Sequence, residues 1–194
     1  MKFRGAMAWG AAALIIGAAL AAAASSPLLA WRDPIYIAAG FSGVVGLALM
    51  LVQPLLAGAH GTMGLRQSTA RAMHRVVGTL LVGAVVLHIA GLWVTSPPDV
   101  IDVLLFRSPT PFAIWGALAM WSVAGAALLA LFRRRLHWRP RNWRIAHVTC
   151  TGAAVLGTVL HTLLIEGTME PLSKVVLCLA VTAVSVAVFA RMKV

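Results

Sequence analysis

Four of the six histidines stand out because they form two pairs with the same spacing. His74 and His88 are fourteen positions apart, and so are His147 and His161. In an α-helix, fourteen residues turn the chain by about 1400°, about 40° short of four full turns, and advance it by about 21 Å. Each pair is therefore predicted to lie on one face of a helix, with its two imidazoles near opposite ends.

If the two helices are parallel neighbours, His74 faces His147 at one depth and His88 faces His161 at another. Two opposed imidazoles can supply both axial ligands of a haem iron. The spacing therefore predicts two haem sites, stacked along the helices. The sequence has no CxxCH attachment motif, so we expect two non-covalent b haems.

The segments around the histidines repeat as well, since Arg71-x-x-His74 matches Arg144-x-x-His147 and Val86-Leu87-His88 matches Val159-Leu160-His161. Mostly small side chains share the face between the paired histidines, where a flat macrocycle could lie: Gly78, Leu81, Val85, Thr151, Ala154 and Thr158. Arg71, Arg75 and Arg144 lie where haem propionates would emerge, and a guanidinium pairs well with a carboxylate.

Haem ligation competes with other roles for these histidines. A buried histidine can serve only as a hydrogen-bonding residue, but ionisable residues in membrane spans are uncommon and usually functional. A copper or zinc site needs three or four ligands at one depth, and this arrangement offers two. The alternative function is a histidine-lined transporter or proton channel without haem. We expect His60 and His137 to lie in loops.

The composition decides which solvent surrounds the helices. The chain has 194 residues, of which 61% are hydrophobic and 11% charged, too apolar for a soluble domain. Six apolar runs approach the length that crosses a bilayer: 6–24, 35–57, 76–95, 112–132, 148–165 and 175–190. We predict an all-α integral membrane protein, a single domain over 1–194 that forms a six-transmembrane-helix bundle with the haems between helices 3 and 5. No soluble dehydrogenase domain is expected.

The first run could be a signal peptide, but its length favours a retained helix.

The charges predict an orientation. The net charge is +11, but the basic residues lie between apolar runs rather than along one polar face, which argues against nucleic acid as a partner. With a cytoplasmic N-terminus, all basic residues except Arg32, Arg107 and Lys174 fall on the cytoplasmic side, and all five acids fall on the other. Arginine and lysine favour cytoplasmic ends, so both termini are expected in the cytoplasm. Cys150 and Cys178 suggest neither a disulfide framework nor a zinc site.

The two histidine pairs on the third and fifth of six spans resemble the ferric reductase-like transmembrane domain family. His74-Arg75-x-x-Gly78 and Trp143-Arg144-x-x-His147 are similar to the family's entrances to those helices. Gln53-Pro54-Leu55-Leu56-Ala57 resembles the close of its second helix. The resemblance covers nearly the whole chain.

This resemblance implies that the chain is the membrane subunit of an oxidoreductase in a bacterial inner membrane. Electrons would pass through the two haems from a cytoplasmic donor to an acceptor on the outer side. In large members a C-terminal domain binds flavin and a nicotinamide nucleotide. Here flavin is expected only through a partner, so the donor would be a separate flavin reductase or a membrane quinol. The acceptor would be a periplasmic protein or a metal ion.

Overall fold

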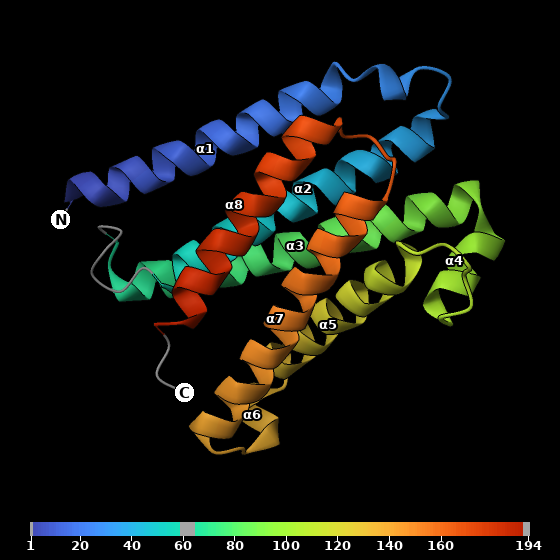
Figure 1. The fold of residues 1–194 in the computed structure, drawn as a ribbon. Helices are drawn as coiled ribbons and strands as arrows, with labels where there is room; N and C mark the ends of the chain where they lie inside the picture. Colours follow the sequence, from blue (N-terminus) through green and yellow to red (C-terminus); the bar gives the residue numbers. More distant parts are fainter. Residues whose placement is uncertain (1, 59–64, 192–194) are drawn as a thin grey trace.

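The computed structural model describes residues 2–58 and 65–191, and these residues form helices and short connections with no strand. Figure 1 shows the element order: α1 (Lys2–Ala24), η1 (Pro27–Leu29), α2 (Pro34–Ala57), α3 (Gln67–Thr95), α4 (Pro97–Leu104), α5 (Ala113–Leu131), α6 (Arg133–Leu136), α7 (Pro140–Leu164) and α8 (Pro171–Phe189). Six of these helices are long and apolar enough to cross a membrane: α1, α2, α3, α5, α7 and α8. The predicted all-α bundle of six transmembrane helices is confirmed. His60, expected in a loop, lies outside the described residues.

The two histidine-bearing helices, α3 and α7, begin earlier than their apolar runs. α3 begins at Gln67 and α7 at Pro140, whereas the runs begin at residues 76 and 148. The added turns carry arginines, whose long aliphatic stems can lie along apolar surface while the charged ends reach water. An apolar run marks the part of a helix that faces lipid and not the whole helix, so His74 and His147 lie inside their helices.

Proline and capping residues fix where several helices begin. Proline occupies the first turn of α2, α4, α7 and α8, where its missing N–H would have no partner in the helix. Asp33 caps α2 by accepting hydrogen bonds from the backbone N–H groups of Ile35 at 2.7 Å and Tyr36 at 3.3 Å. Pro34, Pro97 and Pro171 lie on the side of the bundle with the short helix α4, whereas Pro140 lies on the opposite side, where α7 begins next to α6.

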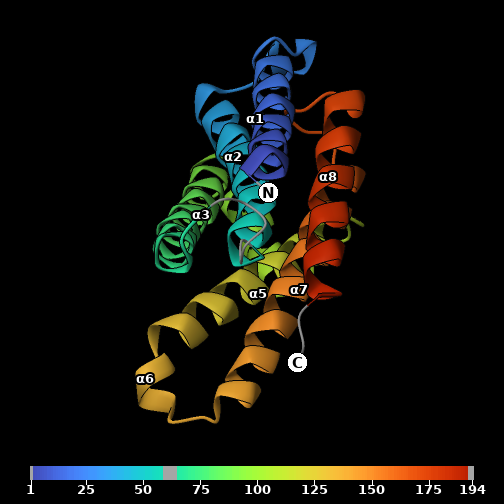
Figure 2. The same ribbon diagram turned by 90° about the vertical axis from the view of Figure 1, so that its left-hand side faces the viewer.

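The transmembrane helices pack mainly as two hairpins. α2 lies along α3 and α5 lies along α7, while α8 contacts both hairpins and α1 lies outside against α8 and α2 (Figures 1 and 2). Small residues allow the close contacts. A Cβ on Gly91 of α3 would lie 2.7 Å from the Cβ of Ala39, and a Cβ on Gly157 of α7 would lie 2.8 Å from the carbonyl oxygen of Trp115. Helices in membranes commonly associate through such small residues.

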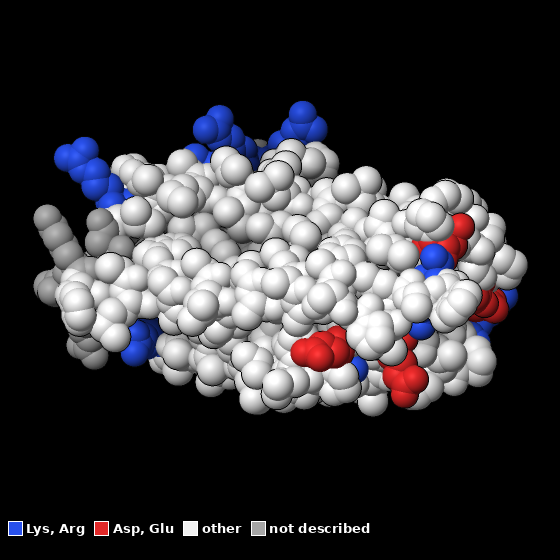
Figure 3. Space-filling view, turned by 90° about the horizontal axis from the view of Figure 1, so that it is seen from above, with Lys and Arg blue, Asp and Glu red and all other residues white. Residues whose placement is uncertain are grey.

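The outer surface of the bundle is apolar between two charged ends. Large hydrophobic side chains are exposed on several helices, including Leu14, Leu80, Val86, Trp121 and Leu179. In Figure 3 every visible acidic side chain lies in the right-hand half of the view, and basic side chains also project at the left-hand end and along the upper edge. An apolar belt between charged ends is the surface expected of a multi-pass membrane protein.

Candidate functional site

Two of the histidines are held in the same way by the neighbouring helix of their hairpin. His88 Nδ1 lies 2.8 Å from the carbonyl oxygen of Ala39, and His161 Nδ1 lies 3.0 Å from that of Phe112. The separation along the chain is 49 residues in both cases, so the two hairpins repeat the contact in the same register. A carbonyl can only accept, so each Nδ1 carries the proton and donates it. The other ring nitrogen, Nε2, is left as the unprotonated, metal-binding atom.

A glycine makes room for each of these hydrogen bonds. Gly43 and Gly116 follow Ala39 and Phe112 by one helical turn, on the side from which the imidazole approaches. A Cβ on Gly43 would lie 3.1 Å from His88 Nδ1, and a Cβ on Gly116 would lie 2.7 Å from His161 Nδ1. A side chain at either position would press on the ring, so the glycines belong to the site.

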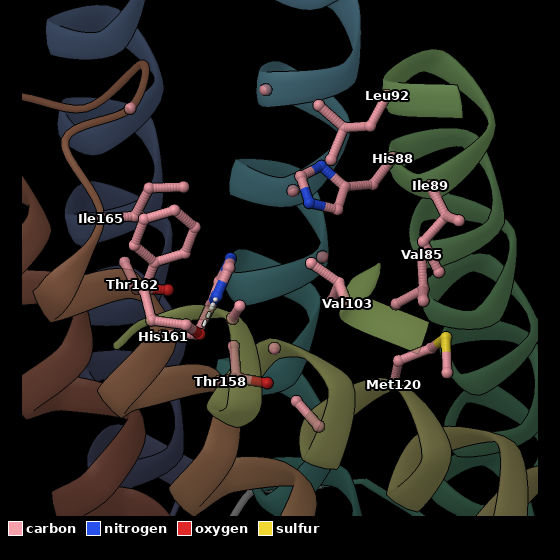
Figure 4. Close-up of a pocket in the computed structure, with 18 of the residues that line it drawn as sticks. Val85, His88, Ile89, Leu92, Val103, Met120, Thr158, His161, Thr162 and Ile165 are labelled. Atoms are coloured by element: carbon pink, nitrogen blue, oxygen red, sulfur yellow. Dashed lines mark hydrogen bonds between the residues drawn. The ribbon is translucent and has the colours of Figure 1, made fainter. Parts of the chain in front are cut away.

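His88 and His161 face one cavity from opposite sides. The cavity has a volume of about 600 Å³, which is within the range of cofactor sites. Figure 4 shows the two imidazoles projecting towards each other from α3 and α7, with Val103 of α4 and Met120 of α5 between their helices. The rings are close enough for charges on them to interact. The lining is mainly apolar, which keeps water away from anything held between the rings.

The other two histidines, His74 and His147, are also within electrostatic range of each other, and their surroundings differ. His74 Nδ1 lies 3.3 Å from the carbonyl oxygen of Gln53, and the side-chain Nε2 of Gln53 donates to the His74 carbonyl at 3.3 Å. His147 Nδ1 is buried and makes no hydrogen bond, although the Ala126 carbonyl lies nearby. Its ring instead stacks on Trp143, with centroids 5.0 Å apart and planes 11° apart.

The surrounding residues fall only partly where the sequence predicted them. Leu81, Val85 and Thr158 line the cavity between His88 and His161, whereas Gly78 faces α2, where its Cβ would lie 2.9 Å from Gln53 Nε2. Arg71, Arg75 and Arg144 are exposed near His74 and His147 on α3 and α7. His137 is exposed in the loop before α7, as expected, with Nδ1 2.8 Å from the Arg135 carbonyl oxygen.

Sequence reasoning did not identify Gly43, Gly116 or Gln53 as site residues. The sequence placed Gln53 and Pro54 only near the close of the second helix, and α2 does end at Ala57, but the Gln53 side chain also contacts His74. A detectable signal existed for the glycines. Gly43 precedes His88 by the same interval as Gly116 precedes His161, so extending the observed repeat to α2 and α5 would have found them.

The donor set fits a planar cofactor better than a bare metal ion. Among the described residues no group of three or more His, Cys, Asp or Glu side chains could hold a metal ion. A haem brings four equatorial nitrogens with it and needs only two axial ligands. The opposed pair His88 and His161, with fixed tautomers and a cofactor-sized cavity between them, meets that need. Cys150 and Cys178 are free thiols on α7 and α8.

Fold and site together define a multi-pass membrane protein with paired histidines in its interior. The family described as "Ferric reductase like transmembrane component" matches residues 42–158, which is more than half of the chain. The protein therefore belongs to this ferric reductase-like transmembrane family. His74, His88 and His147 lie within the matched residues, and His161 lies just beyond them. Comparison with curated proteins found no match, and comparison with solved structures found none.

Proposed function

We propose that this protein carries electrons across a membrane through two b haems, as the membrane subunit of an oxidoreductase. One observation supports the proposal above all others. His88 and His161 face each other across one cavity, and both have Nδ1 bound to a backbone carbonyl, so that both Nε2 atoms are free to bind iron. Membership of the family supports membrane electron transfer independently.

The protein's own residues would bind the haems, orient the histidine ligands and exclude water from the sites. His88 and His161 would bind one haem, and His74 and His147 the other. The iron, when bound, supplies the one-electron chemistry. The carbonyls of Ala39 and Phe112 orient the first pair and make its rings more basic, which stabilises the oxidised iron.

The arginines fit the second site. Arg71, Arg75 and Arg144 are exposed within one turn of His74 or His147, where charged propionates could reach water and guanidinium groups together. We assign them to the propionates of that haem. The apolar lipid-facing belt around the bundle limits water near both sites and so contributes to the potentials of the irons.

The charge distribution supports one orientation. The acids lie near the end of the bundle with α4, and most basic residues lie at the opposite end, with α6 and the beginnings of α3 and α7. By the positive-inside rule the basic end faces the cytoplasm of a bacterial inner membrane, with His74 and His147 on that side. A reporter fused after Val194 is expected to read as cytoplasmic, and a periplasmic reading would reverse the proposed direction.

The proposed donor is a separate cytoplasmic flavin reductase or a membrane quinol. The proposed acceptor, on the outer side, is a periplasmic protein or a metal ion. The cavity that contains His88 and His161 extends to Ser96, Asp99 and Asp102 at the α4 end, so the outer haem is the one nearer to such an acceptor.

The experiment that tests the proposal is a haem-to-protein ratio measured with a reduced-minus-oxidised spectrum. We expect a red protein with a b-type spectrum and two haems per chain at full loading. A colourless protein that remains empty after haem is supplied would contradict the proposal and favour the histidine-lined transporter or proton channel. One haem per fully loaded chain would contradict the two-pair arrangement.

Replacing Gly116 by alanine is expected to damage the outer site selectively. The new Cβ would stand 2.7 Å from His161 Nδ1. A ring that moved away from it would lose the hydrogen bond to the Phe112 carbonyl or the position from which it would bind haem. We expect loss of most of the outer haem. Gly43→Ala, at 3.1 Å from His88, should cost less.

The matched control for Gly116→Ala is Gly83→Ala. Gly83 lies in α3, and its Cβ would meet no atom within 4 Å. Both substitutions change a helical glycine to a residue with better helix propensity, so a general effect on the helix would appear in both. Equal haem content in Gly116→Ala and Gly83→Ala would show that the close approach to His161 is not needed. The measurement is the haem-to-protein ratio with the difference spectrum of each variant.

A further inference from the structure

Of the four histidines, only His147 has a buried Nδ1 without a hydrogen bond. His74, His88 and His161 each place Nδ1 within 3.3 Å of a backbone carbonyl of the adjacent helix, which fixes both the tautomer and the plane of the ring. The Ala126 carbonyl of α5 lies near His147 Nδ1, 21 positions before it as Gln53 is before His74, but the geometry of a hydrogen bond is not met. Metal-binding histidines almost always use their second nitrogen in this way, so something else must fix the His147 ring.

Trp143 is the residue in contact with that ring. It lies one helical turn before His147 in α7, where side chains four residues apart are neighbours. The two rings stack nearly parallel, with centroids 5.0 Å apart and planes 11° apart. A stacked indole restricts rotation of the imidazole out of that plane.

Trp143 is itself held by two contacts, one with the end of α5 and one with α6. Its indole N–H donates to the carbonyl oxygen of Leu129 in α5 at 2.8 Å. The guanidinium of Arg133 lies 4.4 Å from the ring centroid, a distance at which a cation is attracted to an aromatic face. The indole is thus tied to α5, as the carbonyls tie the other three imidazoles to their neighbouring helices.

We propose that Trp143 is a positioning residue, which sets the plane of the His147 imidazole by stacking in place of the hydrogen bond that the other three histidines make. The proposal rests on the proposed function, since the plane of His147 matters only if that ring binds a haem. Its consequence is an inner site with two unlike ligands, His74 held by a hydrogen bond and His147 by an aromatic stack. The outer site has two like ligands.

The test compares Trp143→Leu, which removes the stack, with Trp143→Phe, which restores an aromatic ring. In each purified holoprotein we would record the low-spin ferric EPR spectrum, which responds to the relative orientation of the two imidazole planes. We would also record the rate at which each haem transfers to apomyoglobin. Trp143→Leu should shift the g value of the haem held by His74 and His147. It should also speed transfer of that haem to apomyoglobin about tenfold, which is at the low end of the effects seen when a residue that supports a metal ligand is changed. The outer component should be unchanged, and Trp143→Phe should lie close to the wild type.

Trp138→Leu is the matched control, because Trp138 is an exposed tryptophan in the basic loop just before α7. Among the described residues, the ring that stacks on His147 is that of Trp143. If Trp143→Leu matches Trp138→Leu in both measurements, the proposal is wrong. If Trp143→Leu loses both haems through misfolding, Trp143→Met, which keeps bulk but not the ring, is measured against the same criterion. A wild-type protein with no haem would instead overturn the proposed function, so the two failures can be told apart.

Discussion

Replacing either His88 or His161 by alanine should remove one and the same haem component and leave the other largely in place. The two rings face one cavity from α3 and α7, so under the proposed function each substitution would remove one of two ligands from the same haem. His74→Ala and His147→Ala should form a second matched pair that loses the other component. Difference spectra and haem-to-protein ratios of the four variants give the measurement.

Double substitutions show whether two histidines bind the same haem. Because both ligands act on one site, His88→Ala with His161→Ala should be little worse than either single change, whereas His88→Ala with His74→Ala should lose both components. His137→Ala is the control, since His137 is an exposed loop histidine outside both pairs, with Nδ1 2.8 Å from the Arg135 carbonyl oxygen. If His74→Ala and His88→Ala lost the same component, α3 and α7 would not share the haems. That pairing along one helix is disfavoured because it would require ligands about 21 Å apart to bind one iron.

The second large effect concerns the electron donor. The purified protein, freed of flavin, should show no haem reduction by NADH or NADPH above that of the buffer control. A nicotinamide nucleotide gives up a hydride, a pair of electrons, and a haem iron takes one electron at a time, so a flavin or quinone must stand between them. Addition of a cytoplasmic flavin reductase with its nucleotide, or of a quinol, should restore reduction.

Two further measurements make the donor experiment specific. Dithionite, which delivers single electrons, should reduce both components without any partner and so shows that the haems are intact. With a working donor, the component lost in His74→Ala should be reduced before the component lost in His88→Ala. Rapid reduction of the flavin-free protein by nucleotide alone would contradict the need for a partner.

The fold and the positions of His88 and His161 could be predicted from the sequence, because both depend on simple periodicities. Apolar runs of membrane-spanning length predicted the six helices, and a spacing of fourteen residues placed His88 and His161 on the inward faces of α3 and α7. The bounds of these two helices were less predictable. Hydropathy does not register the arginine-bearing turns before His74 and His147, although they are helical.

The groups that orient the rings were not predictable in the same way. The carbonyls of Ala39 and Phe112 belong to the backbone, and any residue type can provide one, so only packing decides which carbonyl meets an imidazole. The contact of Gln53 with His74 was not predicted, because a polar residue beside a proline is more simply explained as part of a helix end. Trp143 resembles an interfacial anchor in sequence, and its stacking on His147 depends on α5 lying alongside α7.

The pairing of helices into two hairpins bears on how the protein is made in the cell. α2 packs along α3 and α5 along α7, whereas the described parts of α3 and α7 make few direct contacts with each other. The largest helix contacts therefore lie within each hairpin, and a haem bound between α3 and α7, as proposed, would link one hairpin to the other. Because a ligand that binds only the assembled state stabilises it by mass action, haem supply would control how much of the chain escapes membrane proteases. Iron starvation would lower the abundance of the protein as well as its activity.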